Sequence, residues 1–360
     1  MKILDRYLIK QFLLMILFGL LTFTLIFVVI DMMEKLDDFI DQNVPAHLII
    51  QYYLVFTPEI IRLITPIAVL LACLFTAGKM ANLNELTAIK AGGISLYRFM
   101  APFLITSILI SIFSIYFGGY LVPMANKHRI YIERNYMKKD VVYFGSNIFF
   151  QDSKTRIVSI SYFDLSTGMA DNVSIQEFNP NDKTKLVMRT DALRMHYDST
   201  KASWLLMNGI TRTFSDSTES DQTFAVKDYK GLNFKPDEVV KKQRKLEEMT
   251  LTDLQNFAED QYRTGNDPTS TMIEYHSRIA FAFSSIIVVL FGLPISANRR
   301  RGSLAIQFGI NLLITFLYLV FMKVSQAFGK SGVLNPLLTA WFANFIFLIA
   351  ALYNLRRVQK

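Results

Sequence analysis

Six long apolar stretches constrain this chain more than any other feature of its sequence. Each is about 20 residues long, which is the length of helix that crosses the hydrocarbon core of a bilayer. A stretch of this length with few charges is typical of a membrane-spanning helix. We place the six spans at about residues 11–30, 59–78, 99–122, 279–297, 304–322 and 337–355.

A polar block separates the spans into two groups of three. Residues 1–122 and 272–360 are apolar with short polar interruptions, whereas residues 123–271 are polar. The 360-residue chain is 52% hydrophobic and 19% charged, a mixture that argues against both a purely soluble protein and a wholly membrane-embedded one. Asp31 and Glu34 closely follow the first span where a signal peptide would have small residues, so we expect an uncleaved anchor.

The second apolar region, residues 48–77, is too long for one straight span. It contains Thr57, Pro58 and Glu59, which together are typical of a helix start: a capping hydroxyl, a proline at the first helical position and an acid in the first turn. We therefore expect a separate interfacial helix over residues 46–56 before the second span. Pro336 likewise predicts the start of the sixth span.

The basic residues are distributed asymmetrically about the spans. With the N-terminus inside the cell, the inner segments carry twelve basic residues and only two acids, Asp5 and Glu85. The short outer segment after the first span carries five acids and one base, Lys35. The positive-inside rule therefore predicts cytoplasmic termini and a middle block outside. The net charge of +8 is explained by these inner segments and gives no support for nucleic-acid binding.

The middle block has the alternating pattern of an all-β domain. Turn signals separate its apolar strands at roughly 8 to 12 residues. The strand candidates are residues 156–163, 172–178, 193–197 and 204–210. Two interpretations stay open: an ordinary sandwich with a packed core, and an open jelly-roll-like β-roll whose apolar inner face carries acyl chains past Met195, Tyr197 and Trp204. Thr250 to Asp253 resembles a capping box and predicts a short helix over residues 251–264.

Motifs for enzymatic chemistry are missing from the sequence. It has no Walker A motif, no HExxH, no GxSxG and no zinc-ligand spacing, and its one cysteine, Cys73, excludes an intrachain disulfide. Glu59 and Arg62, at the outer end of the second span, are expected to form an ion pair. We therefore expect a protein that is not an enzyme and binds no cofactor; if ATP drives it, a separate cytoplasmic ATPase supplies the energy.

A short amphipathic segment lies between the second and third spans. Leu86 and Ile89 fall at helical spacing over residues 82–92, and Gly92 ends the pattern. A helix this short is marginal alone in water, so its apolar face must pack on something. The membrane surface and a groove in a partner protein are the alternatives. Membrane-surface helices are usually rich in Lys and Arg, and the acid Glu85 near the start favours the protein groove.

At this point the chain resembles a known family, the lipopolysaccharide-export permeases LptF and LptG. Three spans, an extracytoplasmic β domain and three further spans match its architecture. The run N-L-N-E-L-T-A-I-K-A-G-G-I-S over residues 82–95 and the loop N-R-R-R-G over residues 298–302 match its motifs. The stretch N-V-P-A over residues 43–46, followed by T-P-E over residues 57–59, also resembles the family.

The resemblance implies a permease subunit of an ABC-type exporter in the bacterial inner membrane. Two such permeases pair, as a hetero- or homodimer, and bind a dimer of a cytoplasmic ATPase. A single-span β-roll protein and a periplasmic bridge protein complete the path. Lipopolysaccharide would leave the outer leaflet of the inner membrane and pass to the β domain. The alternative is a mechanotransmission or sensor protein that is coupled to an ATPase without a lipid path.

The resemblance also suggests roles for particular residues. The segment over residues 82–92 would be the coupling helix, with Glu85 as the acidic contact to the ATPase. The coupling residues would be Glu85, Leu86, Ile89, Gly92 and Arg300. Lipid A carries phosphates, which basic groups bind through charge-assisted hydrogen bonds. The candidate lipid- and phosphate-binding residues are Arg134, which lies in an R-N-Y run similar to the LptG branch, and Lys127, Arg129 and Lys35.

Overall fold

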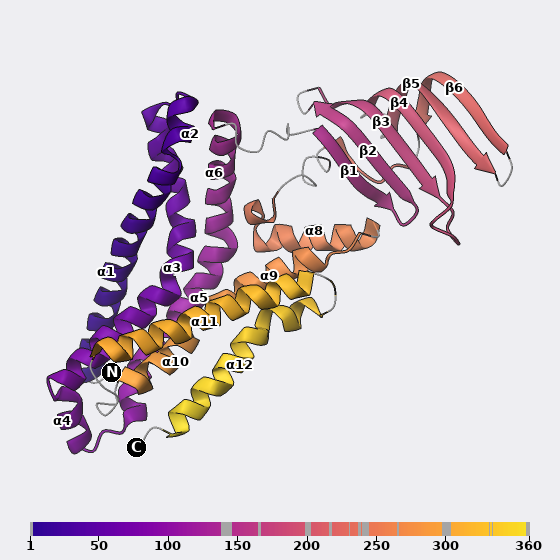
Figure 1. Ribbon diagram of the computed structural model, residues 1–360. Helices are drawn as coiled ribbons and strands as arrows, with labels where there is room; N and C mark the ends of the chain where they lie inside the picture. The colour runs from indigo at the N-terminus through magenta and orange to yellow at the C-terminus, as the bar shows by residue number, and fades with distance from the viewer. Residues whose placement is uncertain are drawn as a thin grey trace. The chain divides into compact units, whose positions relative to one another are not determined.

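The chain divides into a membrane unit and a β unit, which we describe separately. The computed structural model describes residues 3–137, 146–164, 167–198, 203–215, 218–229, 231–236, 239, 245–264, 266–296, 304–330, 332 and 334–357. The membrane unit comprises Met1–Met137, Glu247–Gln255 and Thr269–Lys360, and the β unit comprises Lys138–Leu246 and Asn256–Pro268 (Figure 1). Each unit has a hydrophobic core of its own.

Helices make up the described part of the membrane unit. They are α1 (Ile3–Glu34), α2 (Leu36–Asp41), α3 (Ala46–Asn82), α4 (Glu85–Ala91), α5 (Leu96–Tyr116), the π-helix η1 (Phe117–Leu121), α6 (Val122–Tyr136), α9 (Thr269–Ala282), α10 (Ser284–Ser296), α11 (Leu304–Lys330) and α12 (Pro336–Arg357). Six helical runs in the described residues are long and apolar enough to cross a membrane. The prediction of six spans in two groups of three is thus confirmed.

The prediction of a separate interfacial helix before the second span is wrong. Helix α3 runs without interruption from Ala46 to Asn82, with Pro58 and Pro66 inside it. Proline lacks the N–H that would bond to the preceding turn, but membrane helices tolerate it where neighbouring groups satisfy the freed carbonyls. Here the Thr57 hydroxyl donates to the Tyr53 carbonyl over 2.7 Å instead of capping a new helix.

Two further helical runs extend beyond the predicted spans. Helix α5 continues through η1 into α6, so one run covers Leu96–Tyr136. Helices α9 and α10 together cover Thr269–Ser296. The predicted spans end where polar residues begin, because they were placed by hydropathy. A helix can nevertheless continue through polar residues, since its backbone groups bond to one another whatever the side chains are. As a result Arg62 and Arg278 lie inside helices rather than at their ends.

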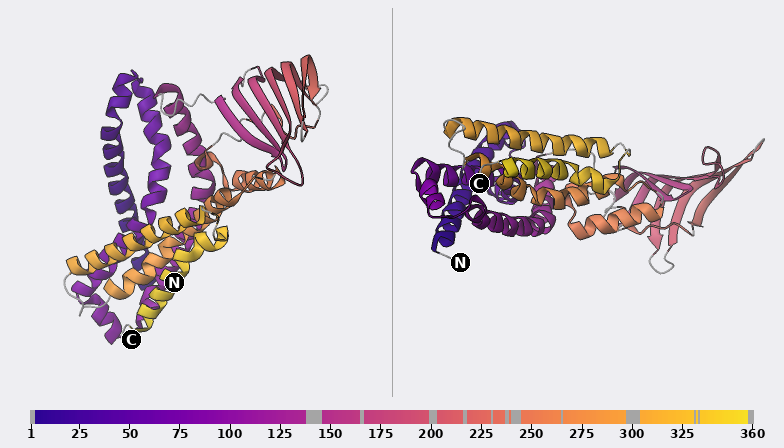
Figure 2. Two further views of the ribbon diagram at one scale, coloured as in Figure 1. Left: turned by 45° about the vertical axis from the view of Figure 1, so that its right-hand side comes forward. Right: turned by 90° about the horizontal axis from the view of Figure 1, so that it is seen from below.

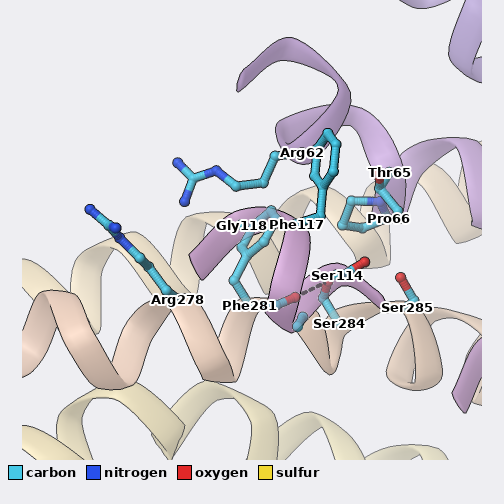
Figure 3. Close-up of a pocket in the computed structure, with 11 residues that line it drawn as sticks. Arg62, Thr65, Pro66, Ser114, Phe117, Gly118, Arg278, Phe281, Ser284 and Ser285 are labelled. Carbon is cyan, nitrogen blue, oxygen red and sulfur yellow. Dashed lines mark hydrogen bonds between the residues drawn. The ribbon is translucent and has the colours of Figure 1, made fainter. Parts of the chain in front are cut away.

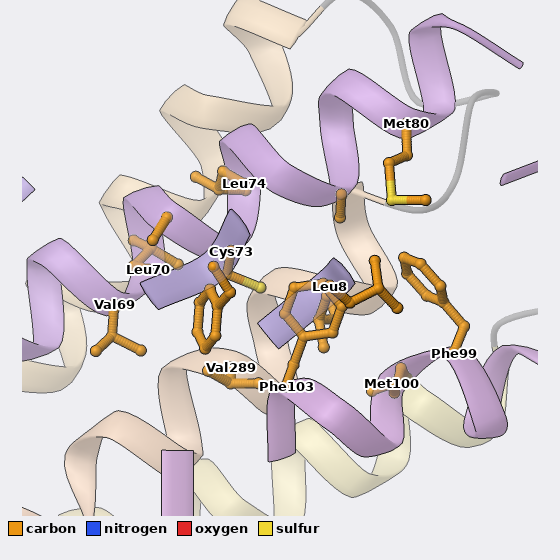
Figure 4. Close-up of a cluster of buried hydrophobic side chains, with 14 of the residues drawn as sticks. Leu8, Val69, Leu70, Cys73, Leu74, Met80, Phe99, Met100, Phe103 and Val289 are labelled. Atoms are coloured by element: carbon orange, nitrogen blue, oxygen red, sulfur yellow. The ribbon is translucent and has the colours of Figure 1, made fainter. Parts of the chain in front are cut away.

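The core of the membrane unit lies where α1, α3, α5 and α10 meet. Phe12 of α1 packs edge-on against Phe103 of α5, with ring centroids 5.0 Å apart. Cys73 of α3 and Val289 of α10 are fully buried beside them (Figure 4). The left view of Figure 2 shows α1 and α3 running side by side. A second cluster joins α10, α11 and α12 around Tyr318.

Small side chains allow these helices to approach closely. A Cβ atom at Gly292 of α10 would lie 3.2 Å from Leu70 Cδ1 on α3, and one at Gly329 of α11 would overlap Thr339 of α12. Lipid tails are as apolar as leucine, so helices in a membrane associate through close packing and polar contacts rather than through the hydrophobic effect. Tyr318 supplies such a polar contact, because its hydroxyl donates to Asn344 Oδ1 over 2.5 Å.

The β unit contains one antiparallel sheet of six strands in the order β1-β2-β3-β4-β5-β6. The strands are β1 (Ser146–Ser153), β2 (Arg156–Asp164), β3 (Met169–Phe178), β4 (Leu186–Asp198), β5 (Ser203–Ser215) and β6 (Thr218–Tyr229). The four predicted strands are confirmed, and β1 and β6 extend the sheet at its two edges. The described strands form this one sheet, so they do not build the two-sheet sandwich that was the alternative.

One face of the sheet is apolar and buried. It carries Val158 and Ile160 of β2, Ile175 of β3, Met195 of β4 and Trp204 of β5, all at most 1% exposed. Residues 231–236, which we call the strap, supply Phe234 to this face. The Trp204 indole donates to the Phe234 carbonyl over 2.9 Å. The chain itself therefore covers part of the apolar face.

Helix α8 (Leu251–Thr264) begins in the membrane unit and ends in the β unit. The short 3-10 helix η2 (Leu246–Glu248) precedes it. The predicted capping box is confirmed: the Asp253 backbone N–H donates to Thr250 Oγ1 and the Thr250 N–H donates to Asp253 Oδ2, both over 3.2 Å. This reciprocal pair satisfies two of the free N–H groups at the helix start.

Candidate functional site

The short helix predicted over residues 82–92 is present as α4 (Glu85–Ala91), while Asn82 belongs to the end of α3. Helix α4 begins after Asn84, which adopts a positive φ of 60°, and the chain leaves it through Gly93 at φ 80°. Leu86 is only 3% exposed because it packs into the core of its own unit, and Ile89 packs against the same core. The apolar face of α4 therefore lies on the membrane unit and is not available to fill a partner's groove.

The surface that α4 leaves accessible is polar and small. Glu85 is half-buried, whereas Thr87, Ala88 and Gly92 are exposed. A partner would thus meet the carboxylate of Glu85 and the outward side of the helix, with Leu86 acting from behind as an anchor. Arg300 and the loop around it lie outside the described residues.

Lys35, a predicted phosphate ligand, belongs to an ionic cluster. It directly precedes α2, and Figure 1 shows α2 at the opposite end of the membrane unit from α4. The Lys35 Nζ lies 3.0 Å from Asp31 Oδ1 and 3.7 Å from Glu133 Oε1 of α6, and it donates to the Tyr52 hydroxyl of α3. The same ammonium lies 5.1 Å from the centre of the Phe56 ring. Lys35 thus ties α1, α3 and α6 together.

Arg129 and Arg134, two further predicted ligands, are also paired with carboxylates. Arg129 Nε lies 3.6 Å from Glu133 Oε1, and Arg129 Nη2 lies 3.7 Å from Glu247 Oε2. Arg134 Nη2 lies 3.4 Å from Glu248 Oε1, whose side chain is only 6% exposed. By contrast, Lys127 is exposed and has no ion pair among the residues that the structure describes. A phosphate would meet Lys127 directly, but at the other three cations it must compete with a carboxylate.

A small polar pocket lies between α3, α5 with η1, and α9 with α10 (Figure 3). Arg62 and Arg278 extend to the same side of it, and the hydroxyls of Ser114, Ser284 and Ser285 also line it. Arg62 pairs with Glu59 over 2.5 Å, as predicted, and Arg278 Nε pairs with Glu274 Oε1 over 2.9 Å.

The size of this pocket limits what it can hold. The space open to the centre of a water-sized molecule is about 20 Å³, which is room for one or two waters. Both arginines already have carboxylate partners. Charged groups inside membrane helices are costly and usually serve a purpose. In this structure the two arginines make contacts within the protein, Arg62 with Glu59 and Arg278 with Glu274 and the Met249 carbonyl.

The predicted acyl-path residues share the apolar face of the β unit. Met195 is fully buried, Trp204 is 1% exposed, and Tyr197 packs edge-on against Trp204 with ring centroids 5.1 Å apart. Phe234 of the strap lies 5.0 Å from the Trp204 ring and 4.8 Å from the Phe150 ring. The face thus has the composition that an acyl chain needs, but the strap now occupies it.

An ionic cluster anchors the strap to the sheet. Asp152 of β1 accepts from the Asn233 N–H over 2.9 Å, and Arg156 donates to the Gly231 carbonyl over 2.6 Å. Tyr229 donates to Glu177 over 2.7 Å. Burial, together with the neighbouring Glu177 carboxylate, raises the pKa of the Tyr229 phenol above its usual value near 10. The phenol therefore stays protonated and keeps this hydrogen bond at physiological pH.

Sequence reasoning missed several partners in these clusters. Glu247 and Glu248 lie far along the chain from the arginines that they bind, as Glu133 does from Lys35, and no local pattern links these pairs. The pairing of Glu133 with Arg129 could have been found, because the two lie four residues apart. Glu274 and Arg278 could have been found, since an i, i+4 acid–base pair next to an apolar span is unusual. Among the described residues, no group of His, Cys, Asp or Glu has the arrangement of a metal site.

These features define a class: a multi-pass membrane protein with a β domain inserted between two groups of three helices. Comparison with known proteins makes the class specific. The family model described as "Lipopolysaccharide export system permease LptF/LptG" matches residues 6–357. The chain belongs to this family of inner-membrane lipopolysaccharide export permeases.

Curated relatives agree with the family match. The chain is 23% identical to the lipopolysaccharide export system permease protein LptF of Escherichia coli strain K12, over 97% of this chain and 93% of the relative. It is similar to the protein of the same name from Shigella flexneri with the same identity and coverage. The resemblance recognised in the sequence motifs is thus confirmed.

Proposed function

We propose that this permease extracts lipopolysaccharide from the outer leaflet of the inner membrane and passes it to its β unit, driven by a cytoplasmic ATPase. The family match over residues 6–357 carries the proposal. The apolar face of the β unit supports it, because Met195, Tyr197 and Trp204 form a surface suited to acyl chains. Both termini and α4 would lie in the cytoplasm, as the inner bias of basic residues indicates.

The partners follow from the same proposal. An ATPase dimer would dock on α4, and a second permease of the family would complete the membrane part. Helix α1 leaves many apolar side chains exposed, among them Leu17, Phe18 and Leu21 at more than 60% exposure. Such a face must meet lipid or another transmembrane surface. A single-span β-roll protein and a periplasmic bridge protein would continue the lipid path beyond the β unit.

Reversing the charge of Glu85 tests the coupling role of α4. We expect Glu85→Arg to lower the amount of co-purified ATPase roughly tenfold or more, since breaking an interfacial charge pair typically costs more than about 2 kcal/mol. Export of lipopolysaccharide should fall with it. The matched control is Ile3→Arg, which adds the same side chain at an exposed position outside α4, at the start of α1. Normal co-purification and export in the Glu85→Arg variant would contradict the proposal that Glu85 contacts the ATPase.

Photocrosslinking tests the lipid path. A crosslinking amino acid at Met195, on the buried face of the sheet, should capture lipopolysaccharide in membranes supplied with ATP. The same amino acid at Leu193, which is 59% exposed, is the control and should capture little. Mass spectrometry of the lipid that co-purifies with the native complex would identify the substrate independently.

A sensor without a lipid path is the alternative function, and the strap favours it. A sensor would have a packed, ligand-free β domain, and Phe234 fills the apolar face as such a domain requires. Failure of capture at Met195, Tyr197 and Trp204 alike, in membranes where a known transporter is labelled, would support the sensor and contradict the transport path through the β unit.

A further inference from the structure

One segment connects the β unit back to the membrane helices and contacts α6, α9 and η1. This return segment, Glu247–Gln255, belongs to the membrane unit, and α8 carries the chain from it into the β unit. Met249, Leu251 and Leu254 in it are 3%, 7% and 0% exposed. A surface connection between two domains is normally exposed and loosely held. The burial of the return segment indicates that it is fixed relative to the helices of the membrane unit.

Ionic contacts from α6 hold the start of the return segment. Arg129 pairs with Glu247 and Arg134 pairs with Glu248. The two arginines lie five residues apart on one helix and bind two consecutive acids. The Glu248 carboxylate is nearly buried, so its pairing with Arg134 is less screened than a surface ion pair would be.

A contact from α9 holds the next residue. Arg278 Nη1 donates to the Met249 carbonyl over 2.5 Å, while Arg278 Nε donates to Glu274. The Arg278 side chain is only 4% exposed. Arginine presents its donors in a rigid planar fork, so one side chain fixes the Met249 backbone relative to α9.

The π-helix η1 provides the third contact, through its two consecutive glycines. A Cβ at Gly119 would overlap the Leu251 side chain, and a Cβ at Gly118 would lie 3.1 Å from Arg62 Cδ on the other side. π-Helices are rare and are often found at functional sites. Here the wider turn and the absence of side chains let Leu251 and α3 both approach the same stretch of backbone.

We propose that the return segment is the joint through which rearrangement of the membrane helices reaches the β unit, and that Arg278, Gly119 and Arg134 are its positioning residues. The inference rests on the proposed transport function. Helices α6 and α9 and the η1 backbone all contact the segment, and α3 packs on the opposite side of η1. A change in the mutual arrangement of these helices therefore moves the start of α8. For Arg134 this role differs from phosphate binding, which the family resemblance suggests.

A size exchange at Gly119 tests the joint. In the native complex, Gly119→Ala should reduce lipid capture by a crosslinker at Met195 roughly tenfold, since residues in contact couple strongly. ATP hydrolysis and the amount of complex should change much less. Leu251→Ala in the same chain makes room for the added methyl group and should restore capture. Gly309→Ala is the matched control, because a Cβ there meets nothing within 4 Å.

The outcomes separate the joint from a purely structural contact. A loss of complex and of ATP hydrolysis in parallel with capture would show that Gly119 only stabilises the fold and would overturn the proposal. So would a Gly119→Ala variant that behaves like Gly309→Ala. If the unsubstituted complex captures no lipid at Met195, the proposed function fails and this inference fails with it.

A charge exchange decides the role of Arg134. Arg134→Glu alone should abolish most capture at Met195, and Arg134→Glu combined with Glu248→Arg should recover it if the ion pair is what matters. A phosphate ligand would not be replaced in this way, because the exchange leaves a carboxylate at position 134. Failure of the exchange to recover capture would overturn the positioning role of Arg134.

Discussion

The membrane unit and the β unit are each stabilised internally by a different kind of packing. The membrane unit relies on close approach of small residues and on polar contacts between helices, such as Gly329 against Thr339 and Tyr318 with Asn344. The β unit relies on large aromatic side chains such as Trp204 and Phe234. Burial of apolar surface is favourable in water but gains little where the surroundings are already lipid. The difference therefore reflects the solvent that each unit is built for.

The comparison predicts its largest effect at the centre of the β unit. Trp204→Ala should lower the free energy of unfolding of the sheet by about 3–5 kcal/mol, as large-to-small substitutions of buried aromatic residues do. It also removes the hydrogen bond to the Phe234 carbonyl. Hydrogen exchange of the backbone amides in β2 to β5 would measure this in the intact chain. The control is Tyr162→Ala on β2, whose side chain is 43% exposed and should matter little.

In the membrane unit, adding even one methyl group at a close contact between helices should lower the stability. Gly329→Ala should destabilise the packing of α11 on α12 by about 1–3 kcal/mol, because its Cβ would overlap Thr339. Thermal unfolding of the detergent-solubilised protein measures the effect. Gly309→Ala on the same helix should leave the melting temperature unchanged. Equal melting temperatures for both variants would contradict the close-packing account.

A single hydrogen bond between helices should be worth less. Tyr318→Phe removes the bond to Asn344 Oδ1 and keeps the ring, so we expect a loss of about 0.6 kcal/mol, the typical value for such bonds in membranes. The melting temperature in detergent measures the loss, and Tyr131→Phe at an exposed position is the control. A loss of several kcal/mol would show that the polar contacts dominate the membrane unit and would sharpen the contrast with the β unit.

The smallest effect near neutral pH concerns Tyr229. Its pKa is raised in the folded state, so between its ordinary value near 10 and the higher folded value the unfolded chain loses the proton first. The stability of the β unit should thus be unaffected at pH 7 and fall as the pH rises above about 10. Tyr229→Phe should weaken this decline. Fluorescence of Trp204, in a chain carrying Trp341→Phe, would follow unfolding at each pH.

The number of spans and the nature of the β unit could be predicted because each depends on local periodicity. Runs of about 20 apolar residues and alternating strands report how a segment meets its surroundings. The error at Pro58 has the same origin: Thr57, Pro58 and Glu59 fit a helix start locally, but the tertiary surroundings let α3 continue through them. For the same reason the predicted spans stop short of the ends of α6 and α11 and begin after the start of α9.

The candidate site was harder to predict because its contacts join distant parts of the chain. The sequence draws attention to Lys35, Arg129 and Arg134 as cations in the outer block. The pairing of Glu133 with Lys35, and the pairing of Glu247 and Glu248 with the two arginines, are identified only in the folded chain. The strap was also missed. Residues 231–236 follow the last strand and have the composition of a linker, so nothing local shows that Phe234 covers the apolar face.

The length of α3 has a consequence for where its ionic contacts operate. A helix of 37 residues is about 55 Å long, since each residue adds about 1.5 Å, whereas the hydrocarbon core of a bilayer is about 30 Å thick. Roughly 25 Å of α3 must therefore stand clear of the acyl region. If Lys79 marks the inner surface, Tyr52 and its partners rise to the height of the sugar and phosphate groups. The outer end of α3 thus places the polar side chains around Tyr52 in the hydrated region above the lipid tails.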